Sequence, residues 1–174
     1  SSKGNQREIF NLDWKVICGL PLDSNLKATL RDLKSKENFL DFRNRVKLKS
    51  TTFYVRSIPH QIDGIKGKLA FCFNEHLKKE IKESRYDEIA YAQSLIAKKK
   101  TIKPDLLKFF GKDGRLVPGR LTEAEEFDGH SALFTTDDIS DENLVRTYFD
   151  KDLIEKAFQS LKGIVKLRPI RHWL

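Results

Sequence analysis

The sequence predicts a mixed α/β protein in which an antiparallel hairpin lies between helical segments. Strand-like runs at residues 51–58 and 66–73 flank Asp63-Gly64, a dipeptide typical of hairpin turns. The following segment, residues 75–100, keeps apolar residues at helical spacing, namely Leu77, Ile81, Ile89, Ala92 and Ile96. The length of 174 residues fits one domain, or one domain with a small insert, and is sufficient for a hydrophobic core.

Two further elements are expected before the hairpin. Residues 15–20 form an apolar run that predicts a buried strand, ended by Gly19 and Pro21. Residues 25–36 carry leucines at helical spacing, and Asp23 or Ser24 is the expected N-cap. Residues 39–49 are basic and irregular, so they predict no regular element.

The long helix is expected to end at Lys98-Lys99-Lys100, with Pro104 soon after. Lysine at a helix C-terminus interacts favourably with the dipole, so a solvated helix end explains this triplet at least as well as phosphate binding. Residues 105–126 show weak strand signals around 106–110 and 115–117, followed by turn residues. No internal repeat or low-complexity tract is evident in the sequence.

The composition favours an anionic partner. There are 33 Lys and Arg against 25 Asp and Glu, a net charge of +8, and the isoelectric point is about 9.4. Such a surplus attracts phosphates without proving that the partner is nucleic acid. No apolar run approaches the ~20 residues that span a bilayer, so no membrane partner is expected. Two cysteines are too few for a disulfide framework and indicate a reducing, cytoplasmic setting.

The sequence has no methionine, which predicts that the chain is a piece of a longer protein. Cys72 and His76 lack the paired spacing of a structural zinc site. No glycine-rich phosphate loop is evident, and the adjacent His130 and Ser131 would point to opposite faces of a strand. Asp128-Gly129 is explained more simply by turn chemistry than by metal binding.

The last helix carries a charged edge. Ser140 is the expected N-cap, with acidic residues in the first turn. At about 100° per residue, four polar side chains fall within roughly 60° of one another on one face, namely Tyr148, Lys151, Glu155 and Lys162. A separate apolar stripe predicts packing against a core. Taken alone, such a helix is more often an amphipathic core helix with a solvated charged edge.

The spacing of those four residues, Tyr-x2-Lys-x3-Glu-x6-Lys, resembles the Tyr-Arg-Glu-Lys signature of bacterial insertion-sequence DDE transposases, with Lys151 where that family usually has arginine. Both flanks are similar as well. Residues 127–137 resemble the family strand that precedes this helix, and residues 167–173 resemble its continuation. The likeness covers essentially the whole chain and is sharp over residues 127–173.

The resemblance implies a partial ribonuclease H-like catalytic core with a β-rich insertion. Residues 1–36 would belong to the core, residues 37–126 to the insertion with one long helix, and residues 127–174 to the core strand and helix that carry the third acidic residue. The two other catalytic aspartates would lie upstream of Ser1. Asp13 and Asp23 are interpreted as turn and cap residues.

The activity implied by the resemblance is metal-dependent cleavage and strand transfer of transposon-end DNA. Glu155 would be the catalytic carboxylate and metal ligand, because hard cations prefer carboxylate oxygens. Two Mg²⁺ ions serve the complete family site, and this chain alone is expected neither to hold them nor to cut DNA. Tyr148, Lys151 and Lys162 would contact DNA, although Lys151 lacks the bidentate fork of arginine.

Two other functions remain open. The main alternative is a non-catalytic, basic DNA-binding or interaction module whose last helix only looks like the signature. A hydrolase unrelated to transposition is another. For the full-length protein, a homodimer is one assembly that the resemblance allows.

Overall fold

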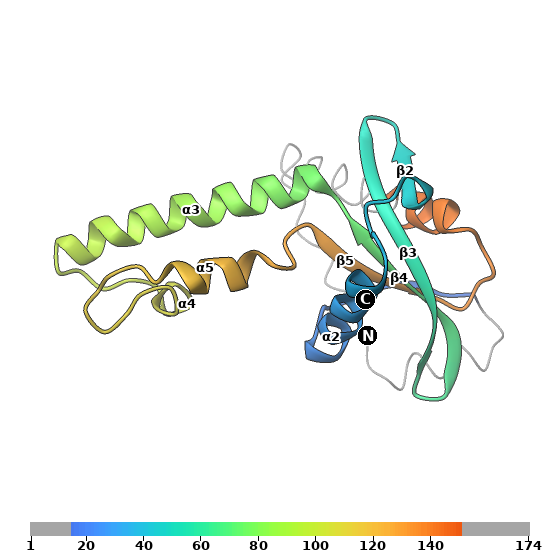
Figure 1. Cartoon of the computed structure of the whole chain (residues 1–174), viewed down its shortest axis with the longest axis horizontal. Helices are drawn as coiled ribbons and strands as arrows, with labels where there is room; N and C mark the ends of the chain where they lie inside the picture. Colours follow the sequence, from blue (N-terminus) through green and yellow to red (C-terminus); the bar gives the residue numbers. More distant parts are fainter. Residues whose placement is uncertain (1–14, 151–174) are drawn as a thin grey trace, which may run out of the picture.

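The computed structural model describes residues 15–150, and within that range five strands form one antiparallel sheet. The strand order is β1-β5-β4-β3-β2, so the first and last described strands are neighbours at one edge (Figure 1). The predicted mixed α/β class is confirmed. The strands are β1 (Ile17–Leu20), β2 (Arg45–Leu48), β3 (Thr51–Ile62), β4 (Ile65–Phe73) and β5 (His130–Thr135).

The central hairpin, β3 and β4, is confirmed with the turn that the sequence predicts. Asp63 and Gly64 both have positive φ, 50° and 83°, and Ile62 pairs with Ile65. Two successive left-handed residues match the right-handed twist of the flanking strands. Aspartate tolerates this conformation better than most side chains, which explains why it precedes the glycine.

Helix α2 (Ser24–Lys36) covers one face of the sheet, as its leucine spacing predicts. Leu26 and Leu30 are buried against Leu69 and Phe71 of β4. The helix begins where Asp23 accepts a hydrogen bond from the Leu26 amide at 2.8 Å. This satisfies one of the amides left free in a first helical turn, and it confirms Asp23 as the N-cap.

The opposite face is covered by the helical residues 141–150. Their N-cap is Ser140, whose hydroxyl accepts from the Asn143 amide at 3.1 Å, as predicted. Leu144 and Val145 are fully buried in a cluster that includes Cys72 of β4. The sheet therefore lies between two helical layers, and the side chains of successive strand residues alternate between them.

A helical arm connects β4 to β5 and projects away from the sheet (Figure 1). It consists of α3 (Glu75–Ala97), α4 (Pro104–Leu107) and α5 (Pro118–Glu125). These helices share a cluster of buried residues that is separate from both faces of the sheet, namely Ile89, Ala92, Leu106, Phe109 and Phe110. The arm thus has a small core of its own, which holds it together beyond the sheet.

A buried ion pair stands where the arm returns to the sheet. Asp128 lies just before β5, and its two carboxylate oxygens accept from the Arg85 guanidinium of α3 at 2.6 and 2.7 Å. The side chains are only 16% and 7% exposed for Arg85 and Asp128. Gly129 follows with a φ of +76°, consistent with the predicted turn. Asp128 therefore serves to join the arm to the sheet.

Three local predictions are wrong. Residues 15–20 were expected to be a buried strand, but β1 is an edge strand and remains half-buried, because only β5 pairs with it. Residues 39–49 were expected to be irregular, yet they form the 3-10 helix η1 (Phe42–Asn44) and the edge strand β2. Residues 106–110 were expected to be strand-like, but Pro104 begins α4 instead. The weak strand signals at 106–110 and 115–117 correspond to an isolated antiparallel bridge between Phe110 and Leu116.

The segments 1–36, 37–126 and 127–174 all contribute to the one sheet. The first supplies β1, the second supplies β2 to β4, and the third supplies β5. Every strand pairing among them is antiparallel. In the range 15–150 no helix is sufficiently long and apolar to cross a membrane.

Candidate functional site

Tyr148 is the one signature residue that the structure describes; Lys151, Glu155 and Lys162 lie outside the described residues. Its ring packs edge-on against Phe149, with 5.3 Å between the ring centroids. Its hydroxyl lies over Gly19 of β1, so closely that any side chain at that position would collide with it. Tyr148 therefore lies above the edge of the sheet formed by β1.

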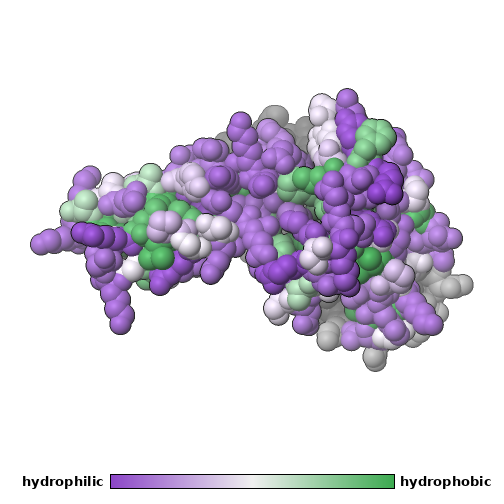
Figure 2. Space-filling view, viewed as in Figure 1, coloured by the Kyte–Doolittle hydropathy of each residue, from purple (hydrophilic) through white to green (hydrophobic). Residues whose placement is uncertain are grey.

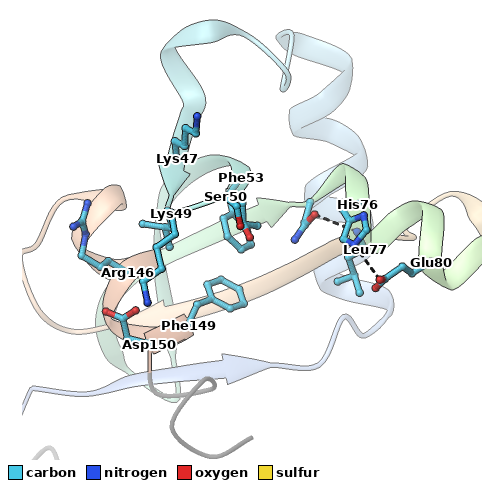
Figure 3. A pocket seen from close by; sticks show the side chains of 13 residues that line it. Lys47, Lys49, Ser50, Phe53, His76, Leu77, Glu80, Arg146, Phe149 and Asp150 are labelled. Atoms are coloured by element: carbon cyan, nitrogen blue, oxygen red, sulfur yellow. Dashed lines mark hydrogen bonds and ion pairs between the residues drawn. The ribbon is translucent and has the colours of Figure 1, made fainter. Parts of the chain in front are cut away.

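A cleft of about 490 Å³ lies beside this helix (Figure 3). Three segments far apart in the sequence form its walls: the β2–β3 turn, the start of α3 and the last described turn of the helical residues 141–150. The lining residues are Lys47, Leu48, Lys49, Ser50, Thr51, Phe53, Asn74, His76, Leu77, Glu80, Arg146, Phe149 and Asp150.

A second hollow of about 390 Å³ adjoins the cleft and reaches Tyr148. The two spaces share four lining residues, namely Phe53, Asn74, Leu77 and Phe149. The rings of Phe53 and Phe149 are stacked, with centroids 4.6 Å apart and planes inclined by 25°. An apolar aromatic surface thus runs from the basic turn towards Tyr148.

Basic side chains border the cleft. Lys47 and Lys49 come from the β2–β3 turn, and Arg146 comes from the helix, where it pairs with Glu142 at 2.7 Å. Figure 3 shows Lys49 pointing towards the helical turn that bears Arg146 and Asp150. Among residues 15–150, neither Lys47 nor Lys49 takes part in an ion pair. Their charges are therefore available to an anion.

The backbone of Lys49 is in the left-handed region, with a φ of 53°. Any residue with a Cβ pays roughly 1–2 kcal/mol for this conformation, and only glycine avoids it. Lysine has no short polar side chain that could relieve the cost locally. A lysine at such a position is notable because the turn would be more stable with glycine.

Acidic groups also reach the cleft. Oε1 of Glu80 lies 3.0 Å from Nε2 of the exposed His76, and Asp150 lies at the opposite wall. These carboxylates do not form a metal site: within the described range, no group of three or more His, Cys, Asp or Glu could hold an ion. Glu155, the predicted metal ligand, lies outside that range.

Cys72 and His76 lie in unlike surroundings. Cys72 is buried in the sheet, and burial, with the nearby Asp141 carboxylate, raises the pKa of its thiol to about 12. His76 is exposed on α3 and faces Glu80. A thiol that resists deprotonation is a poor metal ligand, because the thiolate is the binding form.

Most of the residues that line the cleft were not predicted from the sequence. Lys47 and Lys49 belong to a segment that was expected to be irregular, although the alternation Arg45-Val46-Lys47-Leu48-Lys49 is a strand signal. Val46 and Leu48 pack against the core, which turns the basic residues between them outward. Phe53 and Phe149 carried no recognisable signal, since either could have been an ordinary core residue.

Comparison with known proteins gives no assignment. No protein-family model matches the chain, and neither a curated protein nor a solved structure does so.

Proposed function

We propose that the chain is the C-terminal part of a DDE transposase, which acts in metal-dependent cleavage and strand transfer of transposon-end DNA. In this proposal the sheet and its last helix belong to a ribonuclease H-like core with a β-rich insertion. The observation that carries the proposal is the signature at Tyr148, Lys151, Glu155 and Lys162, whose first residue lines the hollow that adjoins the cleft.

The cleft is suited to a nucleic-acid backbone. Lys47, Lys49 and Arg146 offer positive charge at its border, and the half-buried ring of Phe149, which stacks on the buried Phe53, offers an apolar surface against which a sugar or a base can lie. Basic grooves with aromatic platforms are typical of proteins that bind single strands or distorted duplex ends. Tyr148 would then contact the DNA near the cut, at the end of the adjoining hollow.

Metal chemistry is assigned to no residue in the range 15–150, because its carboxylates do not fit a two-metal site. Two Mg²⁺ ions, ~3.5–4 Å apart, stabilise the attacking and leaving oxygens in enzymes of this reaction class. Glu155 is the one carboxylate of this sequence that the resemblance assigns to them. The other two would have to come from an upstream segment.

The test has a binding arm and a cleavage arm. The 174-residue chain should bind a mixed-sequence 24-bp DNA duplex, with an affinity that falls steeply between ~50 and ~200 mM salt, because bound lysines release phosphate counterions. The double variant Lys47→Gln/Lys49→Asn should weaken this binding and reduce the salt slope by about 2. Asparagine is chosen because it tolerates a positive φ.

In the cleavage arm, a longer protein that includes the upstream segment should cut transposon-end DNA with Mg²⁺. Glu155→Gln in that protein should abolish cutting and leave DNA binding largely intact, since glutamine keeps the shape but loses the charge. Metal-dependent cleavage by the isolated chain that survives Glu155→Gln would refute the site. Salt-dependent binding without cleavage by the longer protein would favour the non-catalytic module.

A further inference from the structure

The free end of the arm carries a concentrated positive charge. We define the arm tip as residues 98–103 and 111–115. It holds six basic residues against one acidic residue, Asp113, a net charge of +5 in a chain whose total is +8. All six are exposed, and Figure 2 shows hydrophilic side chains projecting at the far end of the arm. They are Lys98, Lys99, Lys100, Lys103, Lys112 and Arg115.

The rest of the arm does not share this charge. Helix α3 has five acidic and four basic residues, and residues 116–126 have three acidic residues against Arg120. Within residues 15–150, the tip's one ion pair joins Arg115 to Asp113 at 4.0 Å, and the five lysines have none. The basic residues are therefore segregated to the tip and remain available there.

The helix dipole does not account for a charge of this size. The C-terminus of a helix carries the equivalent of about half a negative charge, which one lysine would offset. Lys99 also has a φ of 57°, in the left-handed region that glycine normally fills at this position. Its amide donates to the Ile96 carbonyl at 2.9 Å, so the turn is an ordinary helix end in every other respect. As at Lys49, the sequence retains a lysine where glycine would be more stable.

The arm holds its tip at a fixed distance from the cleft. Helix α3 begins in the cleft wall, at His76 and Leu77, and ends at the tip. Its 23 residues span about 34 Å at 1.5 Å per residue. The loop around Gly114 packs against the last turn of α3, since a methyl group added at Gly114 would lie 3.3 Å from the Ile96 side chain. The Arg85–Asp128 pair fixes the other end to the sheet.

That distance matches one turn of B-form DNA, roughly 34–36 Å. Phosphates that face the same side of a duplex recur at this interval. We propose that the arm tip is a second phosphate-binding surface, which contacts the DNA duplex bound at the cleft about one helical turn away. This inference rests on the proposed function, because it assumes that the cleft binds DNA.

The test compares a short duplex with a long one by fluorescence anisotropy of the 174-residue chain. A mixed-sequence 8-bp duplex is shorter than the distance between cleft and tip, whereas a 24-bp duplex reaches both. The tip variant is Lys99→Gly/Lys100→Gln/Lys103→Gln, in which glycine also relieves the left-handed backbone. The matched control, Lys15→Gln/Lys36→Gln/Lys66→Gln, removes the same charge from exposed positions outside the cleft and the tip.

For the 24-bp duplex, the tip variant should lose at least tenfold in affinity at ~50 mM salt, and its salt slope should fall by roughly 2 to 3. Its affinity for the 8-bp duplex should change by less than threefold, so the advantage of the longer duplex disappears. The control should keep that advantage. The cleft variant Lys47→Gln/Lys49→Asn should weaken the binding of both duplexes.

The outcomes separate the two ideas. If the cleft variant weakens binding while the tip variant behaves like the control, the tip contacts no DNA and the inference alone is wrong. If the unaltered chain binds neither duplex, the proposed function fails and the inference fails with it. If the tip variant loses binding to a polyglutamate peptide but not to DNA, the tip is a surface for an acidic protein instead.

Discussion

The ion pair that joins the arm to the sheet allows a sharp test of how burial determines its strength. In Asp128→Asn the carboxylate becomes a neutral amide of nearly the same shape, which leaves the Arg85 guanidinium without its charged partner. We expect the free energy of unfolding to fall by about 3 kcal/mol. An exposed arginine–carboxylate pair at Glu126, two residues earlier in the chain, provides the comparison.

The magnitude follows from the contacts. Asp128 accepts two short hydrogen bonds from a charged donor, and each such bond contributes about 1.5–3 kcal/mol. Breaking a buried pair on one side costs about 3–5 kcal/mol. The lower end applies, because the Arg85 side chain is 16% exposed and water can partly hydrate it after the change.

Glu126→Gln is the matched control. Glu126 also accepts two hydrogen bonds from one arginine, Arg31, at 2.7 and 2.9 Å. Here the side chains are 59% and 40% exposed, so solvent screens the pair and ion pairs of this kind contribute little. Removing the Glu126 charge should therefore leave the stability almost unchanged.

The assay is urea denaturation of the 174-residue chain at pH 7, followed by circular dichroism. The double variant Arg85→Gln/Asp128→Asn should be less destabilised than the sum of its single changes, because no unpaired charge remains buried. Equal midpoints for Asp128→Asn and Glu126→Gln would refute the reasoning, since burial would then make no difference to the pair.

Three further results are expected. Gly129→Ala should lower the free energy of unfolding by about 2 kcal/mol or more, because φ is +76° and the new methyl would lie 2.6 Å from the backbone carbonyl oxygen of Asn74, the N-cap of α3. Gly119→Ala, where nothing lies within 4 Å of the new methyl, should leave the urea midpoint unchanged. Burial raises the pKa of the Cys72 thiol to about 12, and it also raises the pKa of Cys18. At pH 8 a thiol reagent should therefore modify Cys72 only after denaturant is added. Mass spectrometry that finds Cys72 labelled in the native protein would contradict this. Burial, with the charge of a neighbouring lysine, lowers the pKa of His130 from 6.5 to about 4. The imidazole is therefore protonated in the unfolded chain before it is protonated in the folded chain, and stability is lost as the pH falls from about 6.5 towards 4. His130→Phe should flatten the plot of urea midpoint against pH over this range, and an unchanged slope would exclude His130 as its cause.

Local signals explain the predictions that the structure confirms. Asp63-Gly64 defines a hairpin turn within two residues, and the caps Asp23 and Ser140 act on amides three residues away. Leucine spacing in α2 reflects a helix that meets the sheet along one stripe. In each case the interaction lies within one element, so the sequence of that element contains it.

The remaining features depend on distant partners. Whether residues 17–20 form a buried or an edge strand depends on the order of the sheet, which no short segment encodes. The cleft is similar, because the turn at 47–49, the start of α3 and the last described turn of the helical residues 141–150 meet only in the folded chain. The charge at the arm tip was visible as Lys98-Lys99-Lys100, but its isolation from the sheet was not.

The position of β5 between β1 and β4 has a consequence for how the chain is made. The pairing of Ile17 with Thr135 joins residues 118 positions apart, whereas β3 and β4 pair across a two-residue turn. On a ribosome that adds ≈ 5–20 residues per second, the hairpin can form while β1 still has no neighbour. Contacts of such long sequence separation also form slowly during refolding. A strand that waits for its partner exposes unpaired backbone groups, which are prone to aggregation. A chaperone that covers β1 would therefore be useful to this protein during the interval between the synthesis of β1 and that of β5.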